Sequence, residues 1–444
     1  MKLLLIRPNI GRLEHSLFVD EARMEPLQLG VLAGLTPADV EVVLCDDRCE
    51  EIPYEHKYSL VAITVETFTA RRAYEISAEF KKRECPVVLG GMHITLLPEE
   101  AALYADSIVT GDAETVWTEV IEDARQNRLK PRYDAPPGIP QPGTATRRDL
   151  FGGKGYLPIT LLQFGRGCRY SCSYCAVSTY FHSCHYKRRI DEVIREIEGQ
   201  NRRTLFFVDD NITADHQAAK ELFRALIPLK VRWVSQASID ITGDRELLTL
   251  MKKSGCLGNV IGFESLSPEN LAGTGKTANV SASSDEYRTE IKILRDFGFQ
   301  TWAAFTLGYD RDTPDALERM LDFSLENRFT FAAFNILMPY PGTRFYQRLN
   351  RENRLLYNGK WWLHPEYRFN HAAYIPAKMT AGQLTETGLH CRSVFNSPGA
   401  IVRRAFDLKT NMRNPLRLGI YCAYNPLFKR ETVKKQDMLL GYSE

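Results

Sequence analysis

Three closely spaced cysteines carry the strongest chemical signal in this sequence. Cys168, Cys172 and Cys175 lie in the stretch GCRYSCSYC, with three and then two residues between them. Two separate Cys-x2-Cys pairs would indicate zinc, but the sequence has no second pair. Three thiolates in one loop, opened here by Gly165 and Gly167, can instead bind a four-iron cluster and leave one iron without a protein ligand. Such an iron is free to bind and activate an outside molecule.

Cys184 is the nearby cysteine that could change this interpretation, because a fourth ligand would close the open iron. It lies nine positions after Cys175, and we expect it to be a bystander, like His182 and His185 beside it. The alternative of three unrelated thiols in a loop stays open at this point. The remaining cysteines are scattered and are expected to be small core residues or inert surface thiols: Cys45, Cys49, Cys85, Cys256, Cys391 and Cys422.

The composition is that of an ordinary globular protein, with 444 residues, 44% hydrophobic and 25% charged, which allows two or three domains. A formal net charge of +2 gives no reason to expect nucleic-acid binding. The amino-terminal MKLLLIRPN has only four consecutive apolar residues, too few for a signal peptide, and no run of roughly 18 apolar residues predicts a membrane span. We therefore expect a cytoplasmic protein whose ten cysteines stay reduced.

The elements that must position the cysteine loop fall into three regions. Residues 1–126 alternate apolar runs such as KLLLIRP, SLVAITV and PVVLGG with helical patterns, which predicts an open, Rossmann-like parallel sheet covered on both faces. Residues 127–157 are rich in proline and glycine and are expected to be a linker. Residues 158–343 contain six strand–helix units, which predict a partial (β/α)6 barrel with its chemistry at the carboxyl ends of the strands. Residues 344–444 are expected to be mainly helical.

Polar residues and glycines follow three strands of the first sheet. Because an open parallel sheet binds ligands beyond the carboxyl ends of its strands, these residues predict one binding edge. They are Thr64, Glu66 and Thr67 after the first of the three strands, Gly90, Gly91 and His93 after the next, and Gly111, Asp112 and Glu114 after the last.

The cysteine motif, with Tyr174 before its third cysteine and a strand just ahead of it, resembles that of the radical S-adenosylmethionine (SAM) enzymes. The resemblance implies a 4Fe-4S cluster bound by Cys168, Cys172 and Cys175, with SAM on the open iron. It also implies that polar groups at later strand ends contact SAM. Asp209, Asp210 and Asn211 would hold its ammonium, with helix capping as the alternative for the two aspartates. Glu264 would reach the ribose, Gly262 would admit the adenine, and Ser238, Gln236 and Gly308 are weaker candidates.

The whole arrangement, over about residues 2–400, resembles the class B radical SAM enzymes, whose amino-terminal domain binds cobalamin. That resemblance implies that the binding edge of the first sheet holds cobalamin. The Asp-x-His-x-x-Gly motif that supplies an axial histidine in some cobalamin domains is missing, since His15 does not fit it. His93 is expected to be a wall residue, and a sheet that has lost its cofactor is the alternative.

The resemblance implies C-methylation of an unactivated carbon in a lipid, tetrapyrrole or natural product, with flavodoxin or ferredoxin as electron donor. A cobalamin-linked oxidative cyclase or ring-rearranging enzyme is the alternative, and a non-catalytic iron–sulfur module is a remote one. Residues 400–444 carry nine Lys or Arg against four Asp or Glu, so they could lie on an anionic membrane or form solvated helices. Trp361, Trp362, Tyr367 and Phe369 are expected to fill a core, with a substrate pocket as the alternative.

Overall fold

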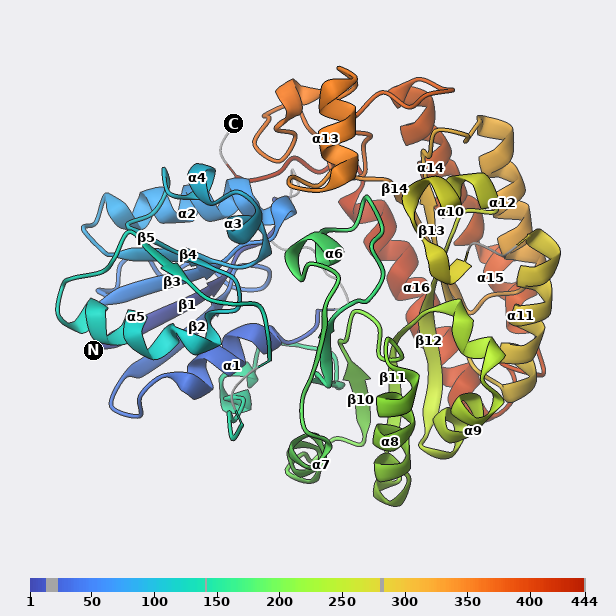
Figure 1. Ribbon diagram of the computed structural model, residues 1–444, viewed down its shortest axis with the longest axis horizontal. Helices are drawn as coiled ribbons and strands as arrows, with labels where there is room; N and C mark the ends of the chain where they lie inside the picture. The colour runs from blue at the N-terminus through green and yellow to red at the C-terminus, as the bar shows by residue number, and fades with distance from the viewer. Residues whose placement is uncertain (13–22, 140–141, 280–282, 443–444) are drawn as a thin grey trace.

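The computed structural model describes residues 1–12, 23–139, 142–279 and 283–442, so His15 lies outside the described residues. Two six-stranded sheets lie side by side, and the carboxyl-terminal helices cover the second sheet and the top of the junction (Figure 1). Each sheet is parallel throughout. This is the α/β architecture that the alternation of apolar runs and helical patterns predicts.

The first sheet has the strand order β2-β1-β3-β4-β5-β6. Its middle strands are apolar on both faces because each face is covered. In β1, Leu3 and Leu5 belong to one buried cluster while Leu4 and Ile6 belong to another. The elements are β1 (Lys2–Arg7), α1 (Leu27–Leu35), β2 (Glu41–Asp46), β3 (Leu60–Thr64), α2 (Ala70–Lys81), β4 (Val87–Gly90), α3 (Met92–Leu96), α4 (Pro98–Ala101), β5 (Ser107–Thr110), α5 (Trp117–Arg125) and β6 (Arg132–Asp134).

The stretch expected to be a linker contributes to the first sheet. Strand β6 pairs with β5 along three residues, and Tyr133 is buried. Farther on, Phe151 packs in the same hydrophobic cluster as Leu3 and Leu5. A three-residue strand with one buried side chain leaves almost no periodicity in the sequence, which explains why the composition of this segment pointed to a linker.

The second sheet has the order β14-β13-β12-β11-β10-β7, so consecutive strands are neighbours, as expected for a partial barrel. Its carboxyl ends face the junction with the first half, where the short hairpin of β8 and β9 also lies. The elements are β7 (Thr160–Leu162), β8 (Gly165–Gly167), α6 (Ala176–Tyr180), β9 (His185–Lys187), α7 (Ile190–Glu198), β10 (Thr204–Phe207), α8 (His216–Leu226), β11 (Arg232–Ala237), α9 (Arg245–Lys253), β12 (Cys256–Glu264), α10 (Pro268–Thr274), α11 (Ser284–Phe297), β13 (Trp302–Leu307), α12 (Pro314–Glu326) and β14 (Phe331–Ile336).

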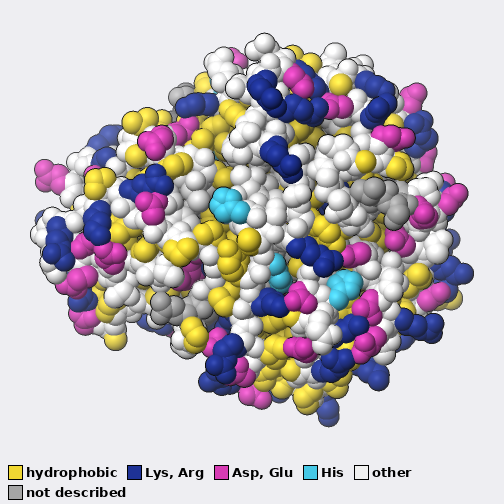
Figure 2. All heavy atoms as spheres, viewed as in Figure 1, with side chains coloured by type: hydrophobic (Ala, Val, Ile, Leu, Met, Phe, Trp, Pro, Cys, Tyr) yellow, Lys and Arg dark blue, Asp and Glu magenta, His cyan; other side chains and the backbone are white. Residues whose placement is uncertain are grey.

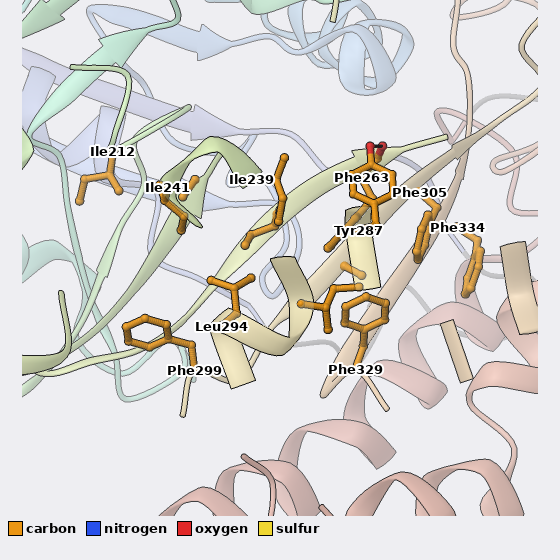
Figure 3. Close-up of a cluster of buried hydrophobic side chains, with 14 of the residues drawn as sticks. Ile212, Ile239, Ile241, Phe263, Tyr287, Leu294, Phe299, Phe305, Phe329 and Phe334 are labelled. Atoms are coloured by element: carbon orange, nitrogen blue, oxygen red, sulfur yellow. Dashed lines mark hydrogen bonds between the residues drawn. The ribbon is translucent and has the colours of Figure 1, made fainter. Parts of the chain in front are cut away.

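Aromatic side chains fill the core under the last three strands of this sheet (Figure 3). Phe263, Phe305 and Phe334 come from β12, β13 and β14 and form a row, with ring centroids 5.7 Å and 5.5 Å apart. Tyr287 of α11 packs edge-on against Phe263 at 5.1 Å. These rings give the sheet a rigid base below the strand ends that face the junction.

The carboxyl-terminal region joins the two halves. It contains α13 (Arg344–Arg351), α14 (Ala381–Phe395), α15 (Pro398–Ala405) and α16 (Pro415–Lys435). Trp361, Trp362 and Tyr367 are buried in the same cluster as the first sheet, which confirms the expectation of a core role for the two tryptophans. Tyr367 and Phe369 also line the cavity described below. On the face shown in Figure 2, acidic and basic side chains are interspersed, in keeping with the small net charge. Within the described ranges, none of the helices combines the length and apolar character that crossing a bilayer demands.

Candidate functional site

The cysteine loop runs from β8 to the start of α6. Gly167, just before Cys168, has a φ of +80°. A Cβ there would collide with the carbonyl oxygen of Cys184, the residue that precedes β9. Glycine is therefore required at the entry of the loop. Its middle is held on both sides, because Ser173 N donates to Thr274 O at 2.8 Å and Phe345 N donates to Ser173 O at 2.9 Å.

The three thiols of the loop share one environment. Cys172 is buried, while Cys168 and Cys175 are partly exposed. Burial raises the pKa of Cys172 to about 11, and the neighbouring Lys276 works in the opposite direction. Among the residues described, no three Cys, His, Asp or Glu side chains are gathered tightly enough to bind one metal ion. A cubane offers each thiolate a different iron atom, so this donor set fits a 4Fe-4S cluster held by three thiolates.

Cys184 differs from the three loop cysteines in its exposure and in the group that it contacts. Its side chain is exposed, and its Sγ contacts the carbonyl oxygen of His182 at 3.8 Å.

Asp209 and Asp210 follow β10 and hold the strand that leads into the loop. Asp209 Oδ2 accepts a hydrogen bond from Phe164 N at 3.0 Å, its Oδ1 accepts from Gly165 N, and Asp210 Oδ2 accepts from Gly167 N at 2.8 Å. Asp209 is completely buried, and this burial raises its pKa to about 7. The helix-capping alternative is wrong, because the following helix α8 is capped by Asp215.

Asn211 and Ser238 form a buried pair beneath the strand ends. Asn211 Nδ2 donates to Ser238 Oγ at 2.9 Å, and Asn211 Oδ1 accepts from Thr213 N at 3.1 Å. Neither side chain lines the cavity described below. Their observed contacts support the turns after β10 and β11.

Glu264, at the end of β12, has a backbone φ of +63°, which is unusual for a residue with a side chain. The register between β12 and β13 shifts at this point. Glu264 Oε2 accepts from Thr306 Oγ1 at 2.7 Å, and its Oε1 lies 3.2 Å from Lys276 Nζ. A Cβ at Gly262 would collide with this carboxylate, so glycine there allows Glu264 to fold back over its own strand.

Lys276 is a site residue that the sequence reasoning missed. Burial acts to lower its pKa, but Glu264 and Cys172 outweigh that effect and raise the pKa above its ordinary value. The cation pairs with the Glu264 carboxylate, and the thiols of Cys172 and Cys168 are close enough to act on its pKa. Its short motif, GTGKTAN, follows α10 and gives no periodic signal that could have identified it.

One large cavity of about 1060 Å³ lies between the two sheets. The second half contributes Tyr174 and Cys175 of the loop, Asp210, and Gln236 of β11. Tyr174 packs edge-on against Tyr309, with the ring centroids 6.0 Å apart. From the first sheet, the cavity is lined by Thr64, Glu66, Thr67, Gly90, Gly91, Gly111, Asp112 and Glu114.

His93 is the one predicted residue of that edge that does not line the cavity. It is fully buried, with Nδ1 3.3 Å from Thr67 Oγ1 and Nε2 3.4 Å from Glu100 Oε1. Its ring also packs against Trp362, with centroids 5.7 Å apart. The side chain thus belongs to the contact between the first sheet and the carboxyl-terminal region.

Arg166, in β8, links the cysteine loop to the first half of the chain. Its guanidinium lies 2.6 Å from Glu114 Oε1 and 3.4 Å from Asp112 Oδ2. Tyr180 of α6 donates a second bond to Asp112, at 2.8 Å. Asp112 and Glu114 therefore line the cavity and also form ion pairs with Arg166 of the second half. Nothing in the sequence singled out Arg166, because an arginine between two glycines does not reveal which carboxylates it will pair with.

Comparison with known proteins agrees with this geometry. Residues 162–324 match the model of the Radical SAM superfamily. The chain is 31% identical over 368 residues to bacteriochlorophyllide d C-8(2)-methyltransferase of Chlorobaculum tepidum, covering 77% of this chain and 80% of that protein. It is 29% identical over 418 residues to bacteriochlorophyllide d C-12(1)-methyltransferase of the same organism, covering 91% of this chain and 89% of that protein.

Among solved structures, the chain is similar to the cobalamin-dependent S-adenosylmethionine radical enzyme OxsB, solved with aqua-cobalamin and S-adenosylmethionine bound. The TM-score is 0.66 at 12% identity, over 97% of this chain and 71% of that one. At this identity, the similarity concerns the fold of both halves.

Proposed function

This chain belongs to the radical SAM superfamily, and from that membership we propose that it is a cobalamin-dependent C-methyltransferase of a small apolar molecule. The observation that supports the proposal is the large cavity between the sheets, which both halves of the chain line. Its wall includes Tyr174 and Cys175 of the cysteine loop together with the strand ends at Thr64, Gly90 and Gly111. A methyl donor and a radical source must reach the substrate in one place, and a shared cavity meets that requirement.

Cys168, Cys172 and Cys175 would hold the 4Fe-4S cluster. When bound, the cluster and SAM together supply a radical that removes hydrogen from an unactivated carbon. Glu264 is suited to accept hydrogen bonds from ribose hydroxyls. Lys276 would face the carboxylate of SAM, since an ammonium offers only donors.

Asp210 is the better candidate of the two aspartates for the ammonium of SAM. Its side chain lines the cavity, whereas both carboxylate oxygens of Asp209 are occupied by backbone N–H groups. The space beside Gly262 is filled by the folded-back Glu264 carboxylate and by Lys276 Nζ, so we do not assign adenine to this glycine. Asn211 and Ser238 would act from beneath, by fixing the turns that carry these groups.

Cobalamin would lie against the strand ends of the first sheet and supplies the methyl group when bound. The surface at Gly90 is open, since a Cβ there would have no neighbour closer than 3.8 Å. Both ring nitrogens of His93 contact protein groups, so His93 would not act as a lower ligand of cobalt.

The protein's own contribution is placement and exclusion of water, so we assign no catalytic acid or base. Aromatic and apolar side chains close the cavity from the carboxyl-terminal side, among them Met338, Tyr340 and Phe369. They suit an extended apolar substrate. A tetrapyrrole is the first candidate, because both relatives described above are named for bacteriochlorophyllide.

A one-electron donor such as flavodoxin or ferredoxin would reduce the cluster. Arg169 and Arg344 are exposed beside the loop, and Arg344 donates to the carbonyl oxygen of Ser171. Such cations would attract an acidic donor protein. We place the enzyme in the cytoplasm, where its cysteines stay reduced.

The test is anaerobic purification with iron, sulfide and cobalamin supplied, followed by turnover with SAM, a reductant and candidate tetrapyrroles. We expect corrin and iron–sulfur absorption in the purified protein. The product should gain the mass of one methylene group, with S-adenosylhomocysteine and 5′-deoxyadenosine formed alongside. A Cys168→Ala protein is the matched control and should form none of these products.

Product analysis also separates the alternatives. A substrate that loses hydrogen and gains a ring without added carbon would make the enzyme a cyclase. An iron–sulfur spectrum that does not change on addition of SAM would support the non-catalytic module.

A further inference from the structure

The segment formed by the last turn of α15 and the turn that follows it, residues 402–413, has its polarity reversed relative to an ordinary surface segment. Its charged and hydroxyl side chains point inward, since Arg404, Asp407 and Thr410 are at most 3% exposed. Its large apolar side chains point outward: Val402 is 57% exposed, Phe406 63% and Leu408 77%. The segment lies on the side of the second sheet away from the first sheet (Figure 1).

The buried polar groups anchor this segment in place. The Arg404 guanidinium lies 3.7 Å from the ring centroid of Phe395 and donates to Phe329 O and Phe395 O, each at 2.9 Å. Asp407 pairs with Arg295 at 3.0 Å and accepts from Thr410 Oγ1 at 2.9 Å. Turning the apolar side inward would break these buried pairs, so the fold holds Phe406 and Leu408 in water.

A single exposed leucine is common and needs no explanation. Three large apolar side chains within seven residues, all more than half exposed, form a patch of the kind that marks a contact surface. Because the turn is anchored from below, no ordering of the chain is required before it binds. The patch is therefore prepared for a partner.

The charges around the patch indicate which partner. Residues 398–416 contain one acidic residue, the buried Asp407. Arg403, Lys409 and Arg413 are exposed on the same segment, and Lys409 pairs with Asp296 of α11. Exposed Arg328 of the neighbouring loop donates to the carbonyl oxygen of Phe406 at 2.8 Å. Apolar side chains ringed by cations match the surface of an anionic lipid bilayer, where acyl chains lie beneath phosphates.

We propose that this segment, residues 402–413, docks the enzyme on an anionic membrane. Val402, Phe406 and Leu408 enter the headgroup region, while Arg403 and Arg413 lie among the lipid phosphates. The contact is interfacial. It is independent of the chemistry proposed above.

The experiment is flotation of the full-length protein with vesicles of phosphatidylcholine alone and with one quarter phosphatidylglycerol. We expect the wild type to bind the anionic vesicles and to dissociate as salt is raised. Phe406→Ser with Leu408→Ser should weaken partitioning roughly tenfold or more, because both apolar anchors are lost. Arg403→Glu should weaken binding by a similar factor at low salt.

Leu103→Ser is the matched control, because Leu103 is also 77% exposed but lies on the first half of the chain. It should bind vesicles like the wild type. All variants change exposed residues, so their thermal midpoints should equal that of the wild type. Equal binding by the double variant and the wild type would overturn the proposal. So would a wild-type dimer that ignores vesicles and dissociates in the double variant, because the patch would then be a contact between copies.

Discussion

Glu264 and Gly167 both have positive φ values, +63° and +80°, beside the groups that we assign to SAM and the cluster. For glycine this conformation is nearly free, but for glutamate it costs on the order of 1–2 kcal/mol. The Thr306 hydroxyl and the Lys276 ammonium hold the Glu264 carboxylate in place. A strained residue with a fixed carboxylate at a strand end is the kind of outlier that indicates function.

Glu264→Gln tests this assignment with little change of shape. The amide can still accept from Thr306, but the largely buried Lys276 loses its carboxylate partner, so we expect the free energy of unfolding to fall by roughly 1.5–3 kcal/mol. Affinity for SAM should fall by roughly tenfold, because the charge that strengthens the ribose hydrogen bonds is lost. Equilibrium dialysis with the reconstituted protein measures the affinity. Unchanged SAM affinity would remove Glu264 from the binding site.

The cysteine assignment makes a second prediction at this scale. Alanine at Cys168, Cys172 or Cys175 should each abolish the iron–sulfur absorption, because two thiolates do not retain the cluster. Cys184→Ala is the control, and it should keep the iron and sulfide content of the wild type. Loss of iron in Cys184→Ala would mean that the cluster has a fourth ligand.

At the scale of elements, β8 connects the two halves through one side chain. Asp209 and Asp210 fix its backbone to the second half, and Arg166 pairs with Asp112 and Glu114 of the first. The strand that precedes the cluster cysteines is thus fixed relative to the edge assigned to cobalamin. We infer that Arg166 is a positioning residue.

Arg166→Lys keeps the charge but loses the planar fork that reaches both carboxylates. We expect a folded protein with a thermal midpoint lowered by a few degrees, since part of a buried ion pair is lost. The number of 5′-deoxyadenosine molecules formed per methylated product should rise several-fold, because radical formation continues while the methyl donor is misplaced. A variant that loses both products in the same proportion would argue for a purely structural role.

The sequence predicted the elements that have strong local signals. Buried strands such as β1 and β12 are apolar runs, and α11 has the capping box of Ser283 and Glu286 at its start and Gly298, with φ +87°, at its end. The three-residue strand β6 has no such signal, since its pairing depends on the sheet that is already there. Arg166 was missed for a related reason, because its partners Asp112 and Glu114 come from the first half of the chain. Lys276 lies only 12 residues from Glu264, but no local pattern in the sequence brings these two side chains together.

The whole molecule is held together by the carboxyl-terminal region, which returns to the first sheet. Trp362 Nε1 donates to Glu100 Oε1 at 2.8 Å, and Lys360 Nζ lies 2.9 Å from Glu100 Oε2. Near the end of the chain, Leu440 is buried in the same cluster, and the Arg72 guanidinium lies 3.8 Å from the ring centroid of Tyr442. The angle between the two sheets, and so the shape of the cavity, depends on these distant contacts.

Glu100 makes this long-range contact sensitive to acid. Burial acts to raise its pKa, but the bonds from His93, Trp362 and Lys360 outweigh this and lower it from 4.5 to about 2. A carboxylate whose pKa is lower in the folded state stabilises the protein above pH 4.5, and that contribution is lost as the pH falls toward about 2. The shift corresponds to at most roughly 3 kcal/mol.

Glu100→Gln should therefore destabilise the protein at pH 7 and have progressively less effect as the pH falls through 4.5 toward 2. Denaturant unfolding at a series of pH values measures the difference in free energy. Glu99→Gln is the matched control, since the neighbouring Glu99 side chain is 95% exposed and should leave the pH profile unchanged. If the Glu100→Gln curve ran parallel to the wild type over the whole range, the carboxylate would not be ionised in this contact. The contact between the first sheet and the carboxyl-terminal region would then depend on Trp361, Trp362 and Leu440 instead.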